Sequence, residues 1–352
     1  MQLPAALRKA VERELATANP ARLRAASARL SEFYRSGSEG ARAVPAPTHA
    51  LGSDELRAAY LAVRMPATFA AVVAALTWTR EACPDEIHSA LDLGSGPGTA
   101  LWAALQVFPM LRAATAIERD LRMIEIARRL ACAPAAGSAM LPDPAPAAGT
   151  QWLQGDLTAA LPQGSWDLVV CAYALNEVDP AQRAEVISRA WARTGKLLVV
   201  VEPGTMAGFA NVLDVRTRLL ASGAILAAPC PNALGCPMSG GGDWCHFAAR
   251  VERTADHRRL KDATLGHEDE KFSYVAFMRS ADARSAFTHG ASPDDGESNC
   301  GHPARIVRHP RIFSGYTQLT LCRDGEIANT TVTRSKKEDW RRLKRLGWGD
   351  RW

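Results

Sequence analysis

The stretch LDLGSGPGTA, residues 91–100, decides the fold of this chain. Leu91–Leu93 are typical of a short buried strand, and they run into a turn with glycine at positions 94, 96 and 98. The apolar run TALWAALQVFP follows and predicts a helix that begins at Thr99. Glycines between a strand and a helix let the backbone approach a ligand closely, and the helix N-terminus offers free N–H groups. The stretch therefore predicts a cofactor-binding loop at the carboxyl end of a strand.

Short apolar strands continue after this loop. They are predicted in AATAIERD (113–120), QWLQGDL (151–157), WDLVVCAYAL (166–175) and KLLVVVEPG (196–204), with helices between most of them. This alternation is typical of a parallel sheet that is covered by helices on both faces. The predicted fold class is therefore α/β with a Rossmann-like sheet.

Three regions are expected along the chain. Residues 1–88 are rich in Ala, Leu, Arg and Glu and form an N-terminal helical region; residues 89–280 form the Rossmann-like domain, with a cysteine-rich insertion at 229–247. Residues 281–352 hold late strands and a basic C-terminal helix. Further strands are predicted in EKFSYVAFMRS (270–280), RIVRHP (305–310), GYTQLTLC (315–322) and EIANTTVTR (326–334).

Composition narrows the class of protein. Of the 352 residues, 47% are hydrophobic, which is enough for a large core and excludes global disorder. The first twenty residues have no apolar leader core and carry Glu12 and Glu14, which argues against a targeting peptide. The longest apolar stretch, Met65–Thr79, is too short to cross a bilayer and predicts a buried helix. We therefore expect a protein of the bacterial-type cytoplasm, without a membrane partner and without disulfides.

Charge is spread unevenly along the chain. The net charge is +4 over residues 1–50, −4 over 51–210, −2 over 211–300 and +7 over 301–352. The segment SKKEDWRRLKRLGWGD (335–350) is strongly basic, with Trp340 and Trp348 available to stack or to pack. Basic ends favour a partner that is rich in phosphate. An ordinary solvated amphipathic helix explains the same pattern.

The glycine loop also indicates which cofactor is bound. A dinucleotide fingerprint needs its third glycine at position 99, where this chain has threonine. The sequence Gly94-Ser95-Gly96-Pro97-Gly98 after LDL instead resembles motif I of the class I S-adenosylmethionine-dependent methyltransferases. The resemblance implies a class I methyltransferase sheet and a bound S-adenosylmethionine. The residues expected to bind it are Asp92 (methionine amino group), Gly94, Gly96, Gly98, Glu118 (ribose) and Asp156 (adenine).

The segment after the fourth strand is where such enzymes meet their acceptor. Here it reads CAYALNE, residues 171–177, and it lacks the signatures of exocyclic-amine and cytosine-carbon methyltransferases. Asn176 and Glu177 are candidates for orienting an acceptor, or for capping the next helix together with Asp179. Cys171 is read as a core residue rather than a nucleophile. Catalysis is thus left open by the sequence.

Three cysteines lie close together in CPNALGCPMSGGGDWCHF, residues 230–247. Cys230, Cys236 and Cys245 offer three thiolates in a loop of glycines and prolines that can wrap around an ion or a cluster. A tetrahedral zinc ion or a four-cysteine iron–sulfur cluster needs one more ligand. From the residues alone, the candidates are His246, Cys300 and Cys322, and iron and zinc are equally compatible with the spacing.

The combination resembles the methyltransferase-like family of small-ribosomal-subunit assembly factors. The matching segments are RMPATFAAV (64–72), LDLGSGPGTALWAA (91–104), CPNALGCPM with DWCHF (230–247), EKFSYVAF (270–277) and the ending RIVRHP, LTLC and WGD. The resemblance implies a 4Fe-4S cluster bound by Cys230, Cys236, Cys245 and Cys322, and association with the rRNA of the small ribosomal subunit. It does not account for Cys300.

Two functions follow as hypotheses. The first is an S-adenosylmethionine-dependent methyltransferase that acts on rRNA of the small subunit. The second is a non-catalytic RNA-binding assembly factor with a vestigial cofactor pocket. A nicotinamide dehydrogenase is a distant third, and no DNA partner is expected.

Overall fold

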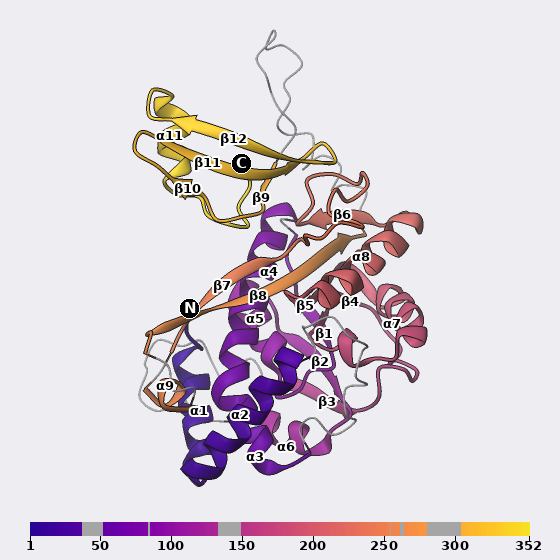
Figure 1. Ribbon diagram of the computed structural model, residues 1–352. Helices are drawn as coiled ribbons and strands as arrows, with labels where there is room; N and C mark the ends of the chain where they lie inside the picture. Colours follow the sequence, from indigo (N-terminus) through magenta and orange to yellow (C-terminus); the bar gives the residue numbers. More distant parts are fainter. Residues whose placement is uncertain (37–51, 84, 133–148, 254, 261–263, 280–303) are drawn as a thin grey trace.

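The computed structural model describes residues 1–36, 52–83, 85–132, 149–253, 255–260, 264–279 and 304–352. Cys300, one of the candidate fourth ligands, lies outside these residues. A large sheet runs through the middle of the molecule, and a second sheet forms a separate lobe above it (Figure 1).

The large sheet has eight strands in the order β3-β2-β1-β4-β5-β8-β6, with β7 also paired to β8. The strands are β1 (Ser89–Leu93), β2 (Ala113–Glu118), β3 (Thr150–Gln154), β4 (Trp166–Ala172), β5 (Thr194–Pro203), β6 (Ile225–Ala228), β7 (Phe247–Glu252) and β8 (His267–Met278). The first five are mutually parallel, whereas β8 runs antiparallel to β5, β6 and β7. This is the predicted class I methyltransferase sheet, so the fold prediction is confirmed.

Helices cover both faces of the sheet (Figure 1). One face packs on α1 (Ala5–Leu15), α4 (Met65–Ala82), α5 (Thr99–Val107) and α6 (Leu121–Ala131). The other packs on α7 (Pro180–Ala192) and α8 (Met206–Ala221). The remaining helices are α2 (Pro20–Ser36), α3 (Asp54–Ala59) and α9 (Ala255–Leu260).

Strand β4 shows why the sequence forms a fully buried sheet. Leu168 and Val170 point into the core beneath α4 and α5, while Val169 and Cys171 point into the core beneath α7 and α8. All four side chains are at most 2% exposed. A strand that is buried on both faces needs an unbroken apolar run rather than an alternating one, and DLVVCA supplies it.

The N-terminal helices reach the sheet through one continuous segment. Helix α3 passes into a π-helical turn, η1 (Tyr60–Arg64), and then into α4, which has Pro66 in its first turn. The helix continues without a break through Pro66, from Asp54 to Ala82. By length and composition Asp54–Ala82 passes as a membrane span, but 72% of its apolar window is buried inside the protein, as expected of a core helix.

The C-terminal lobe is an antiparallel sheet in the order β10-β11-β12, with β9 paired to β11. Its elements are β9 (Arg305–Ile306), β10 (Arg311–Ile312), β11 (Tyr316–Arg323), β12 (Glu326–Thr333) and α11 (Lys337–Leu343). Its small core joins Leu319, Leu321 and Val332 to Leu343 of the helix. Strand β11 belongs to this second sheet, whereas β8 is the late strand that lies beside β5 in the large sheet.

Candidate functional site

The glycine loop takes a backbone shape that only glycine adopts without strain. The φ angles of Gly94, Gly96 and Gly98 are 70°, 52° and 82°, and Gly98 caps the N-terminus of α5. A Cβ at Gly94 would lie 2.5 Å from the Cβ of Ala174, and one at Gly98 would lie 2.7 Å from the ring of Trp152. The loop is therefore shaped by its neighbours to bring backbone N–H groups to the carboxyl edge of the sheet.

Glu118 fastens this loop to the end of β2. One carboxylate oxygen accepts a hydrogen bond from the N–H of Gly96 at 2.8 Å, and the other accepts from the N–H of Asp120 at 2.8 Å. Burial raises the pKa of Glu118, although both hydrogen bonds oppose the rise. A carboxylate has about four acceptor positions, so it keeps room to accept from the hydroxyls of a ligand.

A cavity of about 540 Å³ opens in front of these groups. It lies at the carboxyl ends of the parallel strands, where open α/β sheets bind ligands. Four of the predicted cofactor residues line it: Gly94, Gly96, Glu118 and Asp156. The other two predicted residues, Asp92 and Gly98, are described in the structure but do not line this cavity.

Asp156 sits at the rim after β3. Its Oδ1 accepts from the backbone N–H of Thr158 at 2.8 Å and from the hydroxyl of Thr158 at 2.6 Å. These hydrogen bonds lower the pKa of Asp156, so the side chain is charged at neutral pH. A fixed anion at this rim suits a ligand amino group.

Asp92 is placed differently from the expectation. It lies inside β1 with 3% of its surface exposed, and its Oδ2 has no hydrogen-bond partner in the described part of the chain. Burial raises its pKa to about 7, and nearby Glu118 adds to the rise. The side chain therefore lies behind the glycine loop, inside the sheet.

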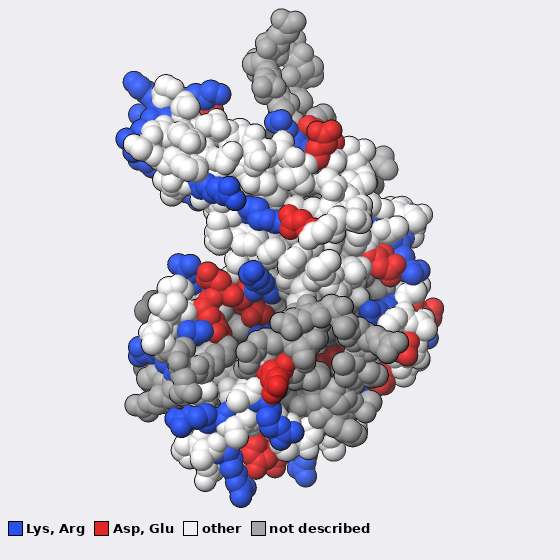
Figure 2. Space-filling view, in the orientation of Figure 1, with Lys and Arg blue, Asp and Glu red and all other residues white. Residues whose placement is uncertain are grey.

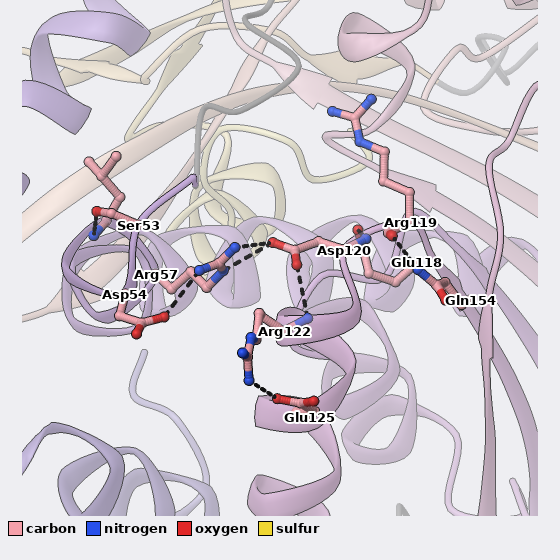
Figure 3. A network of polar contacts seen from close by, with 10 residues as sticks. Ser53, Asp54, Arg57, Glu118, Arg119, Asp120, Arg122, Glu125 and Gln154 are labelled. Carbon is pink, nitrogen blue, oxygen red and sulfur yellow. Dashed lines mark hydrogen bonds and ion pairs between the residues drawn. The ribbon is translucent and has the colours of Figure 1, made fainter.

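The wall opposite the glycine loop comes from the N-terminal helices. Arg57 of α3 reaches across to Asp120 at 3.0 Å, which places the helix over the turn that follows β2 (Figure 3). Arg57 also contacts Asp54, and Asp120 caps α6 through the N–H of Arg122 (Figure 3). The helical region thus closes a cavity that the sheet alone would leave open.

A second polar link crosses the cavity wall deeper in. Arg64 of η1 pairs with Glu270 of β8 through two hydrogen bonds of 2.9 and 3.2 Å, and the Tyr173 hydroxyl donates to Glu270 at 3.1 Å. Tyr173 has φ 57°, a conformation that non-glycine residues rarely adopt and that marks functional sites. Sequence reasoning missed these residues. The available signal was that Arg64 and Glu270 each begin a segment that matches the assembly-factor family.

The two catalytic candidates lie in a short 3-10 helix, η3 (Leu175–Glu177). Glu177 lines the cavity and pairs with Arg119 at 3.0 Å. The Oδ1 of Asn176 is buried without a partner among the described residues. The capping role falls to Asp179, which accepts from the N–H of Ala181. Cys171 is fully buried in the core, as expected.

The cysteine segment forms a second site between the two sheets. Cys230, Cys236, Cys245 and Cys322 all line one small cavity of about 40 Å³. Burial raises the pKa of Cys230 and Cys245, and it raises the pKa of Cys322 to about 12, with the neighbouring thiols adding to the rise at Cys245 and Cys322. The thiols of Cys230, Cys245 and Cys322 are therefore protonated at neutral pH unless a metal displaces their protons.

Two buried arginines flank these thiols. Arg216 of α8 is 6% exposed and donates to the carbonyl oxygens of Asn232 at 3.3 Å and Leu234 at 2.5 Å. Arg305 of β9 is 3% exposed and donates to the carbonyls of Pro229 and Gly349, both at 2.7 Å. Their guanidinium groups favour the charged form of Cys230 and Cys322. Neither arginine was predicted as part of the site, although Arg305 begins the matched segment RIVRHP.

The four thiols share a cavity without meeting at one point. Within the ranges that the structure describes, no group of three or more His, Cys, Asp or Glu side chains could hold a metal ion as it stands. Of the alternative fourth ligands, His246 turns its ring against Trp244 and Trp348. The chemistry of the lining nevertheless suits a four-cysteine centre, because four sulfurs lie beside two buried arginines.

Comparison with known proteins was made by sequence and by structure. The profile of a family described as "Rsm22: Mitochondrial small ribosomal subunit Rsm22" matches residues 55–352. A human protein, "Ribosome assembly protein METTL17, mitochondrial", is 26% identical over 316 residues, which are 85% of this chain and 62% of that protein. The chain thus spans about three-fifths of the length of the curated relative that it matches.

Solved methyltransferase structures are similar at low identity. An O-methyltransferase family protein from Burkholderia thailandensis has TM-score 0.42 and 17% identity, covering 72% of this chain and 67% of its own. Magnesium protoporphyrin IX methyltransferase from Synechocystis PCC 6803, solved with bound SAM, has TM-score 0.37 and 12% identity, covering 71% and 91%.

The comparisons correct one expectation. The prediction of a bacterial-type cytoplasmic location was wrong, because the matching family and the human relative are both described as mitochondrial. That prediction depended on the composition of residues 1–20. The composition of these residues reflects their packing in the fold and does not report the compartment. In the structure they begin with α1, whose Leu7 and Val11 are buried in the main core.

Proposed function

This chain belongs to the Rsm22 family, and from that premise we propose that it is an S-adenosylmethionine-binding factor for assembly of the small ribosomal subunit. The observation that carries the proposal is the cavity at the carboxyl edge of a class I methyltransferase sheet, bounded by the glycine loop and Glu118. The location that goes with this function is mitochondrial. The partner is the small subunit and its rRNA.

The cofactor would be held by this chain's own groups in separate parts of the cavity. Glu118 would accept from the ribose hydroxyls, and Asp156 would meet the adenine amino group. The backbone of Gly94 and Gly96 would pass close to the cofactor, with Asp92 supporting the loop from below. Arg57, Arg64 and Tyr173 would exclude water from the opposite side. When bound, the cofactor supplies an electrophilic methyl group, and transfer needs an acceptor held in line with it.

Methylation of rRNA is the finer form of this proposal. Asn176 and Glu177 would orient the acceptor base, and the proposal is supported by Glu177, which lines the cavity. One observation favours the alternative, a factor that binds the cofactor without turnover. The Tyr173 hydroxyl is engaged with Glu270 rather than turned toward an acceptor.

We propose also that Cys230, Cys236, Cys245 and Cys322 bind a 4Fe-4S cluster. Four thiolates on a cluster of this type leave a net negative charge, which the neighbouring Arg216 and Arg305 offset. A single zinc ion would need sulfurs about 3.8 Å apart, given Zn–S bonds of about 2.3 Å in a tetrahedron. A four-iron cluster binds one thiolate at each iron, so it suits sulfurs spread around a cavity.

Turnover is tested with labelled cofactor and immature small subunits. If the chain is an enzyme, label transfers from S-adenosylmethionine into rRNA, and Glu118→Gln reduces transfer by at least about tenfold because it removes one acceptor oxygen at the ribose. Cofactor binding measured by calorimetry serves as the reference. If the chain binds the cofactor but no label enters rRNA, the methyltransferase hypothesis is contradicted and the assembly function stands. If the chain does not bind the cofactor at all, the main proposal is contradicted.

A further inference from the structure

One face of the C-terminal sheet is uncovered near the turn between β10 and β11, as far as the described residues show. Antiparallel pairing puts Thr317, Leu319 and Leu321 of β11 on the face beneath α11, where all three are buried. The intervening residues therefore point to the opposite face. This second face, which we call the open face, runs from the β10–β11 turn toward Cys322 at its other end.

The open face is polar and carries no acidic side chain among the residues described. It combines an arginine, aromatic rings, amides and hydroxyls. Its members, by register, are Arg311, Phe313, Tyr316, Gln318, Thr320, Ile327, Asn329, Thr331 and Thr333. The hydroxyl of Thr320 donates to Asn329 across the strands at 3.0 Å. A surface without carboxylates, on a segment of net charge +7 over residues 301–352, is complementary to a polyanion.

Two exposed aromatic rings lie at the outer end of this face. Phe313 and Tyr316 flank the turn between β10 and β11 and stack on each other, with centroids 4.7 Å apart and planes 13° apart. They are 43% and 38% exposed, although rings of this size are usually buried in a monomer. The pair offers a preformed flat surface on which a further ring can stack.

The same end of the lobe carries the basic cluster. The N–H of Arg334 donates to the carbonyl of Gly315 at 3.0 Å, so the start of the basic segment adjoins the aromatic pair. The seven Lys and Arg side chains from Arg334 to Arg345 are all exposed. Figure 2 shows Lys and Arg gathered at this end of the lobe, where α11 lies. The tryptophans of the segment are not available for stacking, because Trp340 and Trp348 pack against the cores.

We propose that Phe313 and Tyr316, with Arg311 and the exposed start of the basic segment, bind single-stranded RNA by stacking unpaired bases. The proposal deepens the assembly function above and depends on it. Aromatic platforms beside cationic groups bind single strands, because every base has a face to stack while phosphates meet the cations. A duplex buries its base faces and would contact only the cations.

The test compares variants of the full chain in binding a labelled oligouridylate of about 12 nucleotides by fluorescence anisotropy. Phe313→Ala with Tyr316→Ala is expected to weaken binding at least about fivefold, because each stacked base depends on a ring. Tyr316→Phe keeps the ring and should bind as the wild type does. Arg311→Gln should reduce the salt dependence of binding by about one phosphate contact.

Ile312→Ala is the matched control for general apolar contact. Ile312 is adjacent to the pair and 81% exposed, but it has no ring. Equal losses for Ile312→Ala and the double variant would overturn the proposal in favour of a protein-docking surface, and so would unchanged binding in the double variant. Co-sedimentation of wild-type protein with small subunits is measured in parallel. Failure of that arm contradicts the assembly function, whereas intact sedimentation with an unaffected double variant overturns only this surface.

Discussion

Asp92 shows how one buried side chain of the glycine motif makes the stability of the fold depend on pH. It is buried inside β1, and its pKa is raised to about 7. Between about pH 4 and pH 7 the folded chain therefore keeps a proton that the unfolded chain has lost. Since the folded state binds more protons there, stability falls as pH rises through this window.

Asp92→Asn should remove the part of the pH-dependent loss of stability that Asp92 causes. We expect the cofactor-free variant to be more stable than the wild type above pH 7, by up to a few kcal/mol, with the difference vanishing toward pH 4. The measurement is urea unfolding at several pH values. Glu202 is also fully buried and has a pKa of about 7. The stability of the variant should therefore still fall as pH rises, but less steeply than that of the wild type. Identical pH profiles for the two proteins would contradict this reading of Asp92.

Replacing Gly94 separates the backbone strain of a positive φ angle from the steric conflict between a new Cβ and Ala174. Gly94→Ala should lower stability by about 2 kcal/mol more than Gly223→Ala and weaken cofactor binding at least about tenfold. Both glycines have positive φ, but a Cβ at Gly223 meets nothing within 4 Å. Thermal unfolding and calorimetry measure the two effects. Equal losses of stability for both variants would mean that the contact with Ala174 does not constrain the loop.

At the residue scale the sequence identified acids and glycines but not their cationic partners. Gly94, Glu118 and Asp156 follow strands directly, so strand order alone brings them to one edge. Arg64 and Glu270 are 206 positions apart and meet only because β8 inserts antiparallel beside β5. The pairing of Arg64 with Glu270 depends on the order of strands in the sheet, and a local sequence pattern does not show that order.

Among the elements, the cysteine loop between β6 and β7 depends on Arg305 for its position. This side chain links β9 to the loop at Pro229 and to the C-terminal segment at Gly349. Arg305→Ala should lower the free energy of unfolding by about 2–4 kcal/mol, because two buried carbonyls lose their donor. It should also reduce the metal content per chain.

The control for Arg305→Ala is Arg323→Ala. Arg323 lies on the same sheet, but its side chain is 41% exposed and pairs with Asp324 at its own turn. Urea denaturation should show little change in this control. If the two variants lost equal stability, the link through Arg305 would not be what positions the loop.

The strands flanking the cysteine loop also show where sequence reasoning ends. Strands β1 to β5 were predicted because each apolar run is bounded by a turn or a helix. Strand β6 was not predicted, since its four residues follow α8 almost directly, and neither was β7. The burial of β7 alternates, so every second residue is at least partly exposed and the segment resembles a loop. The placement of β11 in a separate sheet depends on pairing between distant segments.

On the scale of the whole molecule, the described residues form two sheets (Figure 1), and the proposed metal centre is a cavity lined by residues of both lobes. Three of its cysteines come from the loop that leaves the large sheet, and Cys322 comes from β11 of the small one. A cluster at this point would join the lobe that carries the proposed RNA surface to the domain that carries the cofactor cavity. Cluster loss would then affect RNA binding without touching either surface.

The most direct measurement is iron, zinc and acid-labile sulfide per chain, with an optical spectrum, on anaerobically purified protein. The account predicts a brown protein with about four iron and four sulfide per chain. Colour and iron should be lost in Cys322→Ser but kept in Cys132→Ser, whose thiol is exposed at the end of α6. A colourless wild type with one zinc, or with no metal, would contradict it.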